Sequence, residues 1–267
     1  MVDDLKRILE KLGLIILNFP LLRLLKYRYR YNIFDSIHKE ATKDSVKYIC
    51  EKASNSVMLG NRKQLLKFAL KEYVKNSEYK DKLFLEFGTY KGELINFCSS
   101  LIPEAKFYGF DSFEGLPESF SIWKRGRFDI KGKLPKVNKN VSLIKGYFNE
   151  TLPKFLEEHK EKAAFIHIDC DLYSSTKTIF DNIYDRIVPN TVIQFDEYYN
   201  YPGWRNHEFK AFQEFCKKYN VEYEYIGISH MQVAVVIKSI KNWLLFLLYN
   251  NILSSSRGFS HYNLLID

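Results

Sequence analysis

The sequence has few cysteines and lacks a long apolar run. It holds four cysteines in 267 residues, and no two of them are spaced as C-x-x-C. This scarcity argues against a disulfide framework and favours reduced thiols in a cytoplasmic protein. No apolar run approaches the roughly 18 residues that a membrane-spanning helix needs, and no cleavable signal peptide is apparent. We therefore expect a cytoplasmic globular protein.

The composition and the charge are those of a chain with one good-sized core. Apolar residues make up 46% of the sequence, which is enough for one domain and an appendage. The formal net charge of +8 points to an anionic partner or surface, and says nothing about the fold. No basic and aromatic RNA-binding motif accompanies this charge, so nucleic acid is not an expected partner.

The stretch KLFLEFGTYKG, residues 82–92, predicts a strand, a glycine turn and the start of a helix. A dinucleotide-binding loop would need G-x-G-x-x-G, so that the backbone could approach a pyrophosphate. This chain instead has Glu86 followed by Gly88 and Gly92. A carboxylate at the end of the strand favours a cationic ligand or an amino group. The pattern resembles the first motif of class I S-adenosylmethionine (SAM) methyltransferases.

A second carboxylate stands where Rossmann-like folds bind a ribose. The stretch KFYGFD, residues 106–111, predicts the next strand and ends in Asp111. A carboxylate at this strand end can accept two hydrogen bonds from a diol, which is how such folds hold ribose hydroxyls. We expect Asp111 to bind the cofactor, with an ordinary exposed loop aspartate as the alternative.

Four more carboxylates follow two later predicted strands. One strand ends in Asp169 and Asp171, and the next is followed directly by Asp196 and Glu197. Carboxylates that converge on one crevice repel each other unless a cation lies among them. Oxygen ligands suit Mg²⁺ or a similar divalent ion such as Mn²⁺. His167, in the middle of its strand, is more typical of a core histidine with satisfied hydrogen bonds than of a ligand.

The ends of the chain are expected to lie outside the catalytic fold. Residues 1–31 are leucine-rich and carry seven Lys or Arg against three acids. This pattern indicates a basic amphipathic helix that packs on the core or in a homo-oligomer, with peripheral contact to an anionic membrane as the alternative. Helical spacing continues over residues 45–79. We assign residues 1–80 to an N-terminal helical cap, 81–240 to the main domain and 241–267 to a C-terminal tail.

A basic insertion separates two of the predicted strands. Residues 124–145 carry eight Lys or Arg and one acid. A long connection without clear periodicity is more often functional than filler. Its charge could bind an anionic acceptor, or it could simply be a solvated loop.

Several motifs together resemble one family of enzymes. The blocks FLEFGTYKG, FYGFDSFEGLPE, KGYFNETLP, HIDCDLYSST and VIQFDEY are similar to those of the macrocin O-methyltransferase family of SAM-dependent sugar methyltransferases, over residues 83–237. The resemblance implies a seven-stranded Rossmann-like α/β sheet with helices on both faces. It also implies methyl transfer to a sugar hydroxyl, with SAM and Mg²⁺ as cofactors.

The resemblance also implies roles for particular residues. Asp169, Asp196 and Glu197 would hold the metal, although the family has Asp at the position of Glu197. Apart from the resemblance, methyl transfer needs a general base, and Asp169 or Asp171 is best placed for it by sequence position, with His230 as a more distant candidate. The residues expected to bind SAM are Glu86, Gly88, Thr89, Gly92, Asp111, Ser112 and Phe148.

Two other functions remain open from the sequence. A metal-dependent O-methyltransferase could act on a non-sugar vicinal diol such as a catechol. A non-catalytic module that binds SAM or nucleic acid would explain the positive charge, but it would not need the cluster of acids. The motifs favour a sugar or glycan as the acceptor. The positive charge of the insertion is compatible with an anionic acceptor.

Overall fold

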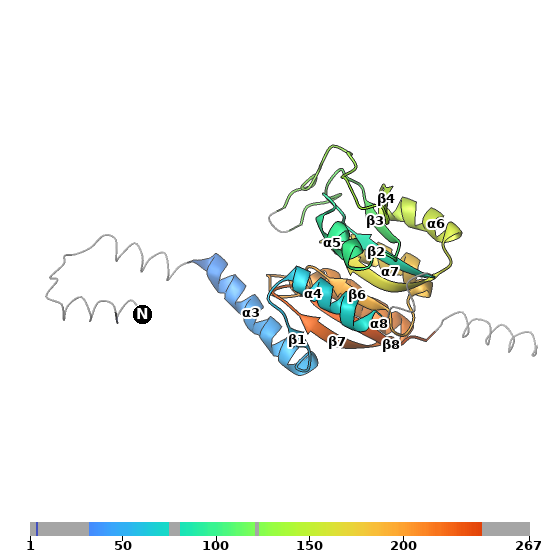
Figure 1. Cartoon of the computed structure of the whole chain (residues 1–267). Helices are drawn as coiled ribbons and strands as arrows, with labels where there is room; N and C mark the ends of the chain where they lie inside the picture. Colours follow the sequence, from blue (N-terminus) through green and yellow to red (C-terminus); the bar gives the residue numbers. More distant parts are fainter. Residues whose placement is uncertain (1–3, 5–31, 75–80, 121–122, 242–267) are drawn as a thin grey trace, which may run out of the picture.

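The molecule is built on one mixed sheet with helices on both faces (Figure 1). The fold is that of a computed structural model of the chain, which describes residues 4, 32–74, 81–120 and 123–241. The predicted basic helix over 1–31, apart from residue 4, and the tail after residue 241 lie outside the described residues. No helix among the described residues is both long enough and apolar enough to cross a bilayer.

The sheet has eight strands, one more than the resemblance implies. Their order is β1-β7-β8-β6-β5-β2-β3-β4, and β8 runs antiparallel to both of its neighbours, β6 and β7. The strands are β1 (Val57–Met58), β2 (Lys82–Phe87), β3 (Phe107–Asp111), β4 (Val141–Lys145), β5 (Lys162–Ile168), β6 (Val192–Phe195), β7 (Glu222–Ile228) and β8 (Val233–Ser239). The Rossmann-like class is thus confirmed, with β1 as an added edge strand.

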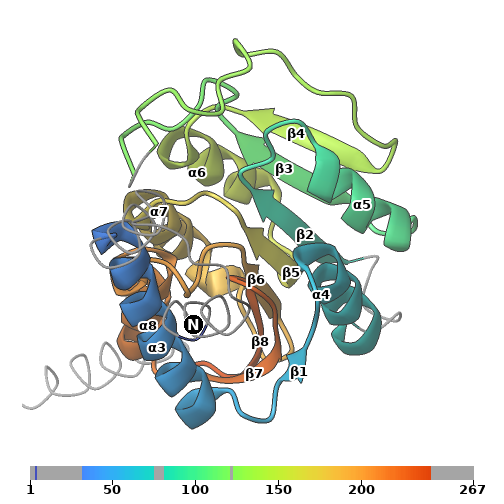
Figure 2. The same ribbon diagram turned by 90° about the vertical axis from the view of Figure 1, so that its left-hand side faces the viewer.

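Helices cover the two faces of this sheet unequally. Figure 2 shows α3, α6, α7 and α8 on one face and α4 and α5 on the other. The helices are α3 (Ile33–Lys52), α4 (Arg62–Phe68), α5 (Glu93–Leu101), α6 (Phe148–Glu158), α7 (Tyr173–Ile183) and α8 (Glu208–Tyr219). A π-helical segment, η1 (Ala69–Tyr73), continues α4, and 3₁₀ turns lie at Tyr184–Arg186 (η3) and Trp204–Asn206 (η4).

Each face of the sheet has its own core because the strands are apolar on both sides. One core packs α6, α7 and α8 against residues such as Leu85, Phe87 and Ile166. The other packs α4 and α5 against Phe84 and Phe165. Strands buried on both faces are the expected result where helices cover both sides of a parallel sheet.

The helical cap predicted for the N-terminal region differs from the structure. The expected run over residues 45–79 is broken after Lys52, the last residue of α3. The chain then forms β1, which pairs with β7, before α4 begins. The break follows from local sequence, because Asn61 caps α4 by accepting a hydrogen bond from the Gln64 amide (3.0 Å).

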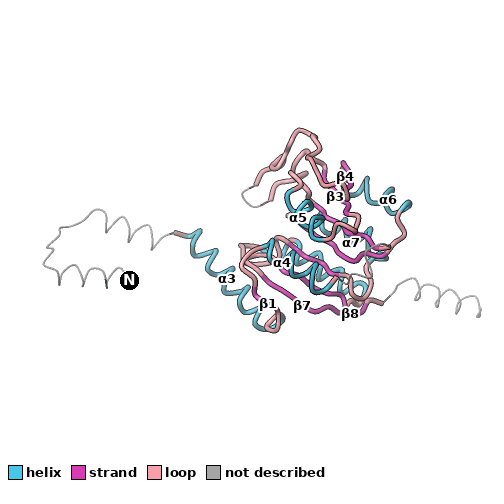
Figure 3. Tube along the Cα trace, in the orientation of Figure 1, coloured by secondary structure: helices cyan, strands magenta, loops and turns pink. Residues whose placement is uncertain are grey.

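The basic insertion is a long irregular connection between β3 and β4 (Figure 3). Backbone hydrogen bonds close it on itself, from Leu116 to Arg127 and from Gly132 to Phe113. Asn138 fixes its far end, because its amide groups bond to Asn96 on α5 (2.8 and 2.9 Å). The loop therefore holds a defined position over the end of the sheet.

Candidate active site

A cavity of about 550 Å³ lies at the carboxyl ends of the parallel strands. Its walls come from the segments that follow β2, β3, β4, β5 and β6 and from the insertion. Ligands of open α/β sheets bind at this edge, where the strand ends leave a crevice. The volume is in the range of small-molecule sites.

The turn after β2 comes unusually close to the end of β5. Gly88 has φ +95°, and a Cβ atom added there would lie 1.7 Å from the carbonyl oxygen of Asp169. Only glycine fits this position, because it has no side chain and tolerates positive φ. Gly92 also has positive φ (+77°) and caps α5, but it does not line the cavity. The two predicted cofactor glycines therefore have different roles.

Asp111 ends β3 and lines the cavity, as predicted. Its carboxylate accepts hydrogen bonds from the backbone amides of Tyr90 (2.6 Å) and Phe113 (2.7 Å). Burial raises the pKa of Asp111, and the backbone hydrogen bonds oppose that rise. These bonds fix the carboxylate at the mouth of the glycine turn, and each oxygen retains a lone pair for a ligand.

Glu86 and His167 form a buried pair on the adjacent strands β2 and β5. The Nδ1 atom of His167 lies 2.9 Å from Oε2 of Glu86, and the two residues are register partners in the sheet. Burial raises the pKa of Glu86; burial also disfavours the imidazolium of His167, but Glu86 outweighs this and the pKa of His167 is raised. Oε1 of Glu86 and Nε2 of His167 have no hydrogen-bond partner among the described residues.

The carboxylates predicted to cluster do come together. Asp171, which lies beyond the end of β5 with φ +62°, lines the cavity with Asp169 and Glu197. Asp196 follows β6 and is buried. The backbone amide of Glu197 donates to Oε2 of the fully buried Glu208 on α8 (3.1 Å). Glu208 is a site residue that sequence reasoning missed, since nothing in its aromatic helix distinguishes it.

Burial and mutual repulsion make these acids hard to ionise together. Burial, then the charge of Asp196, raises the pKa of Asp171 to about 7. The same two causes raise the pKa of Asp169 well above its ordinary value. The pKa of Glu197 is also raised well above its ordinary value, by burial first and then by the charge of Asp169. A cation among them would reverse these shifts.

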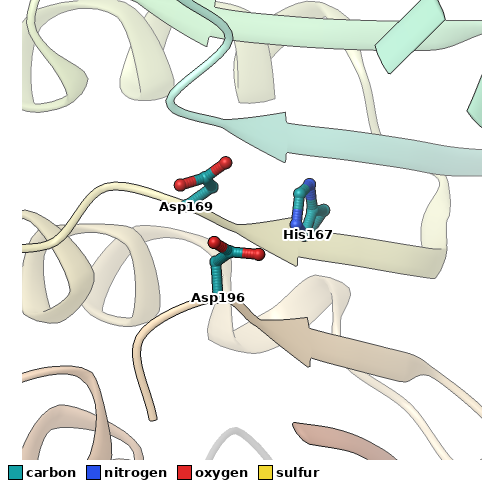
Figure 4. A group of neighbouring side chains, drawn as sticks. All are labelled: His167, Asp169 and Asp196. Atoms are coloured by element: carbon teal, nitrogen blue, oxygen red, sulfur yellow. The ribbon is translucent and has the colours of Figure 1, made fainter. Parts of the chain in front are cut away.

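Three side chains of this cluster could hold a metal ion together. Ligand atoms of His167, Asp169 and Asp196 lie within 4.8 Å of one another, and Figure 4 shows all three side chains around one space. Two of the three predicted metal ligands are therefore brought together. Glu197 stands outside this group, although its Oε2 atom is buried without a partner.

Arg62 brings a positive charge to the cluster from the first turn of α4. Its Nη1 atom lies 3.3 Å from Oδ2 of Asp196 and its side chain lines the cavity. Burial disfavours the charged guanidinium, but Asp196 and Asp169 outweigh this and raise its pKa. No local sequence motif predicts this contact, because Arg62 and Asp196 are 134 residues apart in the chain.

The insertion gives the cavity an aromatic wall. Trp123 and Phe128 line it and pack edge to face, with ring centroids 5.0 Å apart. Tyr90, from the glycine turn, contacts Phe128 in the same way (5.5 Å). The neighbouring Arg125 and Arg127 are exposed, so the loop presents apolar rings to the cavity and positive charge to solvent.

Most of the predicted site residues line this cavity. Of the predicted SAM-binding residues, all but Gly92 do so. The exposed His230 lies in the turn between β7 and β8 and is not among the lining residues. The structure therefore does not bring this candidate base to the site.

The geometry is that of a class I methyltransferase fold, and a family comparison agrees. Residues 85–198 match a family described as a methyltransferase domain. This part of the chain is therefore similar to a methyltransferase domain, and the expectation of a methyltransferase enzyme is confirmed. None of the curated proteins compared matches the sequence.

Solved structures share the fold at low sequence identity. CalS11, a calicheamicin methyltransferase, has 17% identity and a TM-score of 0.51, over 83% of this chain and 94% of that chain. The O-methyltransferase NovP has 19% identity and a TM-score of 0.51, over 66% of this chain and 80% of that chain. An apo structure of CalS11, which is named there as a TDP-rhamnose 3'-O-methyltransferase, has 19% identity and a TM-score of 0.48, over 83% of this chain and 96% of that chain.

Replacing Gly88 by alanine should separate the effect of close approach from that of backbone strain. Gly88→Ala forces its Cβ into the Asp169 carbonyl oxygen, so we expect a lower melting temperature and loss of SAM binding. Gly203 also has positive φ (+80°), but a Cβ there meets nothing within 4 Å. Gly203→Ala should therefore cost only the left-handed strain of about 1–2 kcal/mol. Equal melting shifts and intact SAM binding in both variants would contradict the role given to Gly88.

Proposed function

We propose that this chain is a SAM-dependent O-methyltransferase that acts on a sugar hydroxyl and uses a divalent cation. One observation carries the proposal: a single cavity joins the glycine turn and Asp111 to the carboxylates Asp169, Asp171 and Glu197. A site for the methyl donor and a site for an activated hydroxyl therefore adjoin. The motif resemblance to the macrocin O-methyltransferases supports the same reaction.

The residues at the glycine turn fit SAM chemically. Buried Oε1 of Glu86 and Oγ1 of Thr89 have no hydrogen-bond partner, and both residues line the cavity. They would receive the donor's ammonium group, while Asp111 would accept bonds from its ribose hydroxyls. Phe148 supplies an apolar wall on the same side.

The carboxylate side of the cavity fits a divalent cation. Oδ1 of Asp196, Oε2 of Glu197 and Nε2 of His167 are buried atoms without partners. Asp169 and Asp196 would hold the ion. A bound divalent cation lowers the pKa of a coordinated sugar hydroxyl and orients it.

The residues of the chain then have separate tasks in methyl transfer. The acceptor oxygen forms a bond to the methyl carbon as the carbon–sulfur bond breaks, and sulfur leaves as the neutral thioether. Asp171, which lines the cavity beside Asp169, takes the hydroxyl proton. The aromatic wall of the insertion limits the access of water, and alignment of the two substrates supplies the rest of the rate.

The acceptor is proposed to be a sugar that carries an anionic group. CalS11, which has a similar fold, is described as a TDP-rhamnose 3'-O-methyltransferase. Exposed Lys and Arg of the insertion lie next to the cavity residues Trp123 and Phe128. Positive charge beside a cavity favours a phosphate- or carboxylate-bearing substrate.

The direct test of the function is a methyl-transfer assay with SAM and Mg²⁺ or Mn²⁺. Nucleotide sugars, uronic acids and catechol would be offered, and products read by mass spectrometry. We expect a methylated sugar. Methylation of catechol alone would replace the sugar acceptor by a non-sugar vicinal diol.

Asp111→Asn should weaken the binding of SAM about tenfold or more. The change keeps the shape of the side chain but removes the charge that strengthens hydrogen bonds to the ribose. Asp129→Asn is the matched control, because Asp129 accepts the same type of backbone hydrogen bond, from Lys131 (2.5 Å), on the exposed insertion. Calorimetry measures both. Equal affinities for SAM in the two variants would remove Asp111 from the cofactor site.

Removing the cation should abolish methyl transfer and leave SAM binding intact. We expect chelator-treated protein to be inactive and to recover on addition of Mg²⁺ or Mn²⁺, and we expect Asp196→Asn to lose affinity for the ion. Asp171→Asn should keep the ion and lose turnover, since Asp171 acts on the proton. Full activity in protein shown to be metal-free would contradict the use of a cation.

Reversing the charge of the insertion should weaken acceptor binding. For the triple variant Lys124→Glu, Arg125→Glu and Arg127→Glu we expect a higher KM for an anionic acceptor at low salt, with the difference shrinking as salt screens it. The residues of the test variant directly precede or follow the lining residues Trp123 and Phe128 or stand between them. The comparison variant changes Lys131, Lys133 and Lys136, none of which adjoins a lining residue in the sequence. If KM is the same in both variants at low salt, the charge serves only solvation.

A further inference from the structure

His167 is a fully buried histidine with only half of its hydrogen-bonding capacity used. Its Nδ1 atom pairs with Oε2 of Glu86 at 2.9 Å. Its Nε2 atom is buried and has no partner. A buried polar atom left without a partner is costly, and native structures rarely keep one without a reason. The sequence predicts a core histidine with both nitrogens hydrogen-bonded, but among the described residues only Nδ1 has a hydrogen-bond partner.

The His167 side chain lies beside the carboxylate cluster. Figure 4 shows the imidazole beside the carboxylates of Asp169 and Asp196, and ligand atoms of the three residues lie within 4.8 Å of one another. Two ligands about 2.1 Å from one ion lie at most roughly 4.2 Å apart. Small side-chain adjustments therefore suffice to place all three on a single ion.

The two carboxylate oxygens of Asp196 have different surroundings, and one of them remains available to a metal. Oδ2 faces Nη1 of Arg62 at 3.3 Å, whereas Oδ1 is buried without a partner. Arg62 can therefore hold the carboxylate in place without occupying both oxygens. Orientation of a ligating carboxylate by a second polar group is common around protein-bound metals.

Glu86 prepares His167 for the same task. When Glu86 is ionised it can only accept a hydrogen bond, so a neutral His167 ring beside it carries its proton on Nδ1 and its lone pair on Nε2. Carboxylate, histidine and metal in a row is a recurring arrangement, in which the carboxylate fixes the tautomer and orients the ring. The pair on β2 and β5 thus links the cofactor turn to the cation site.

We infer that Nε2 of His167 is a ligand of the divalent cation, together with Asp169 and Asp196. The cation itself rests on the proposed function above. A mixed nitrogen and oxygen ligand set favours Mn²⁺ or Co²⁺ over Mg²⁺, because imidazole suits transition metals and Mg²⁺ prefers oxygen. The site is therefore a manganese-type centre with a nitrogen ligand, in place of the oxygen-only site for Mg²⁺ or Mn²⁺ that the sequence predicts.

The test begins with the unmodified 267-residue chain, stripped of metal and loaded with Mn²⁺. Pulsed electron paramagnetic resonance detects the magnetic coupling between Mn²⁺ and a directly bound imidazole nitrogen, and needs no activity. We expect this coupling, and we expect Mn²⁺ to bind at least tenfold more tightly than Mg²⁺ by calorimetry.

Two variants then separate a ligand from a structural role. His167→Asn retains an amide near the Nδ1 position to bond Glu86 but has no atom at the Nε2 position; we expect the nitrogen coupling to vanish and Mn²⁺ affinity to fall tenfold or more, with Mg²⁺ affinity changed less. His230→Gln, at an exposed turn outside the cavity, should change neither. SAM affinity and the melting temperature of the metal-free proteins report on folding.

The outcomes distinguish this inference from the function on which it rests. One outcome is that Mn²⁺ binds without nitrogen coupling and binds equally well to folded His167→Asn. This outcome overturns His167 as a ligand and leaves it as a partner of Glu86, but it does not contradict the proposed cation. No binding of Mn²⁺ or Mg²⁺ to the unmodified chain overturns both the ligand and the proposed cation. SAM binding in the same samples tests the methyltransferase reaction separately.

Discussion

The contact between the turn after β2 and the end of β5 is the constraint on which the site depends. Gly88 lies so close to the Asp169 carbonyl oxygen that no side chain fits between them. The same pairing of strands puts Glu86 opposite His167. One close approach therefore joins the turn that would bind SAM to the carboxylates that would act on the acceptor. Two chemically different half-sites share one rigid edge of the sheet.

The carboxyl-end edge of the sheet combines several carboxylates with one arginine, and their charges partly balance. Asp169, Asp171, Asp196 and Glu197 are gathered where water is scarce, and their raised pKa values record the cost. Arg62 offsets part of this charge from α4. Among the described residues, some buried atoms of this cluster have no hydrogen-bond partner, and the proposed cation rests on them. A divalent ion would complete a site that the chain leaves incomplete in charge and in hydrogen bonds.

In the proposed function, the insertion between β3 and β4 would contribute to specificity and not to the chemical step. Its backbone is closed by its own hydrogen bonds and is tied to α5 through Asn138. It contributes Trp123 and Phe128 to the cavity but no carboxylate among the proposed reacting groups. Aromatic rings and exposed cations on such a loop can change between relatives without disturbing the sheet, because loops tolerate substitution better than the strands they connect.

Local sequence patterns predict seven of the eight strands, the glycine turn and the acids at the strand ends, because these features depend on short-range patterns of apolar residues, glycine and carboxylates. Which of those acids meet depends on contacts between distant segments, and these contacts also bring in residues with no local signal. Arg62 reaches Asp196 across 134 residues of sequence, Glu208 contacts the Glu197 backbone from α8, and β1 joins the edge of the sheet. His167 was visible as a buried histidine, but which of its nitrogens is unpaired depends on the distance to Glu86 on another strand. Such contacts form between segments remote in the chain, and the pattern around each residue does not encode the distance between them.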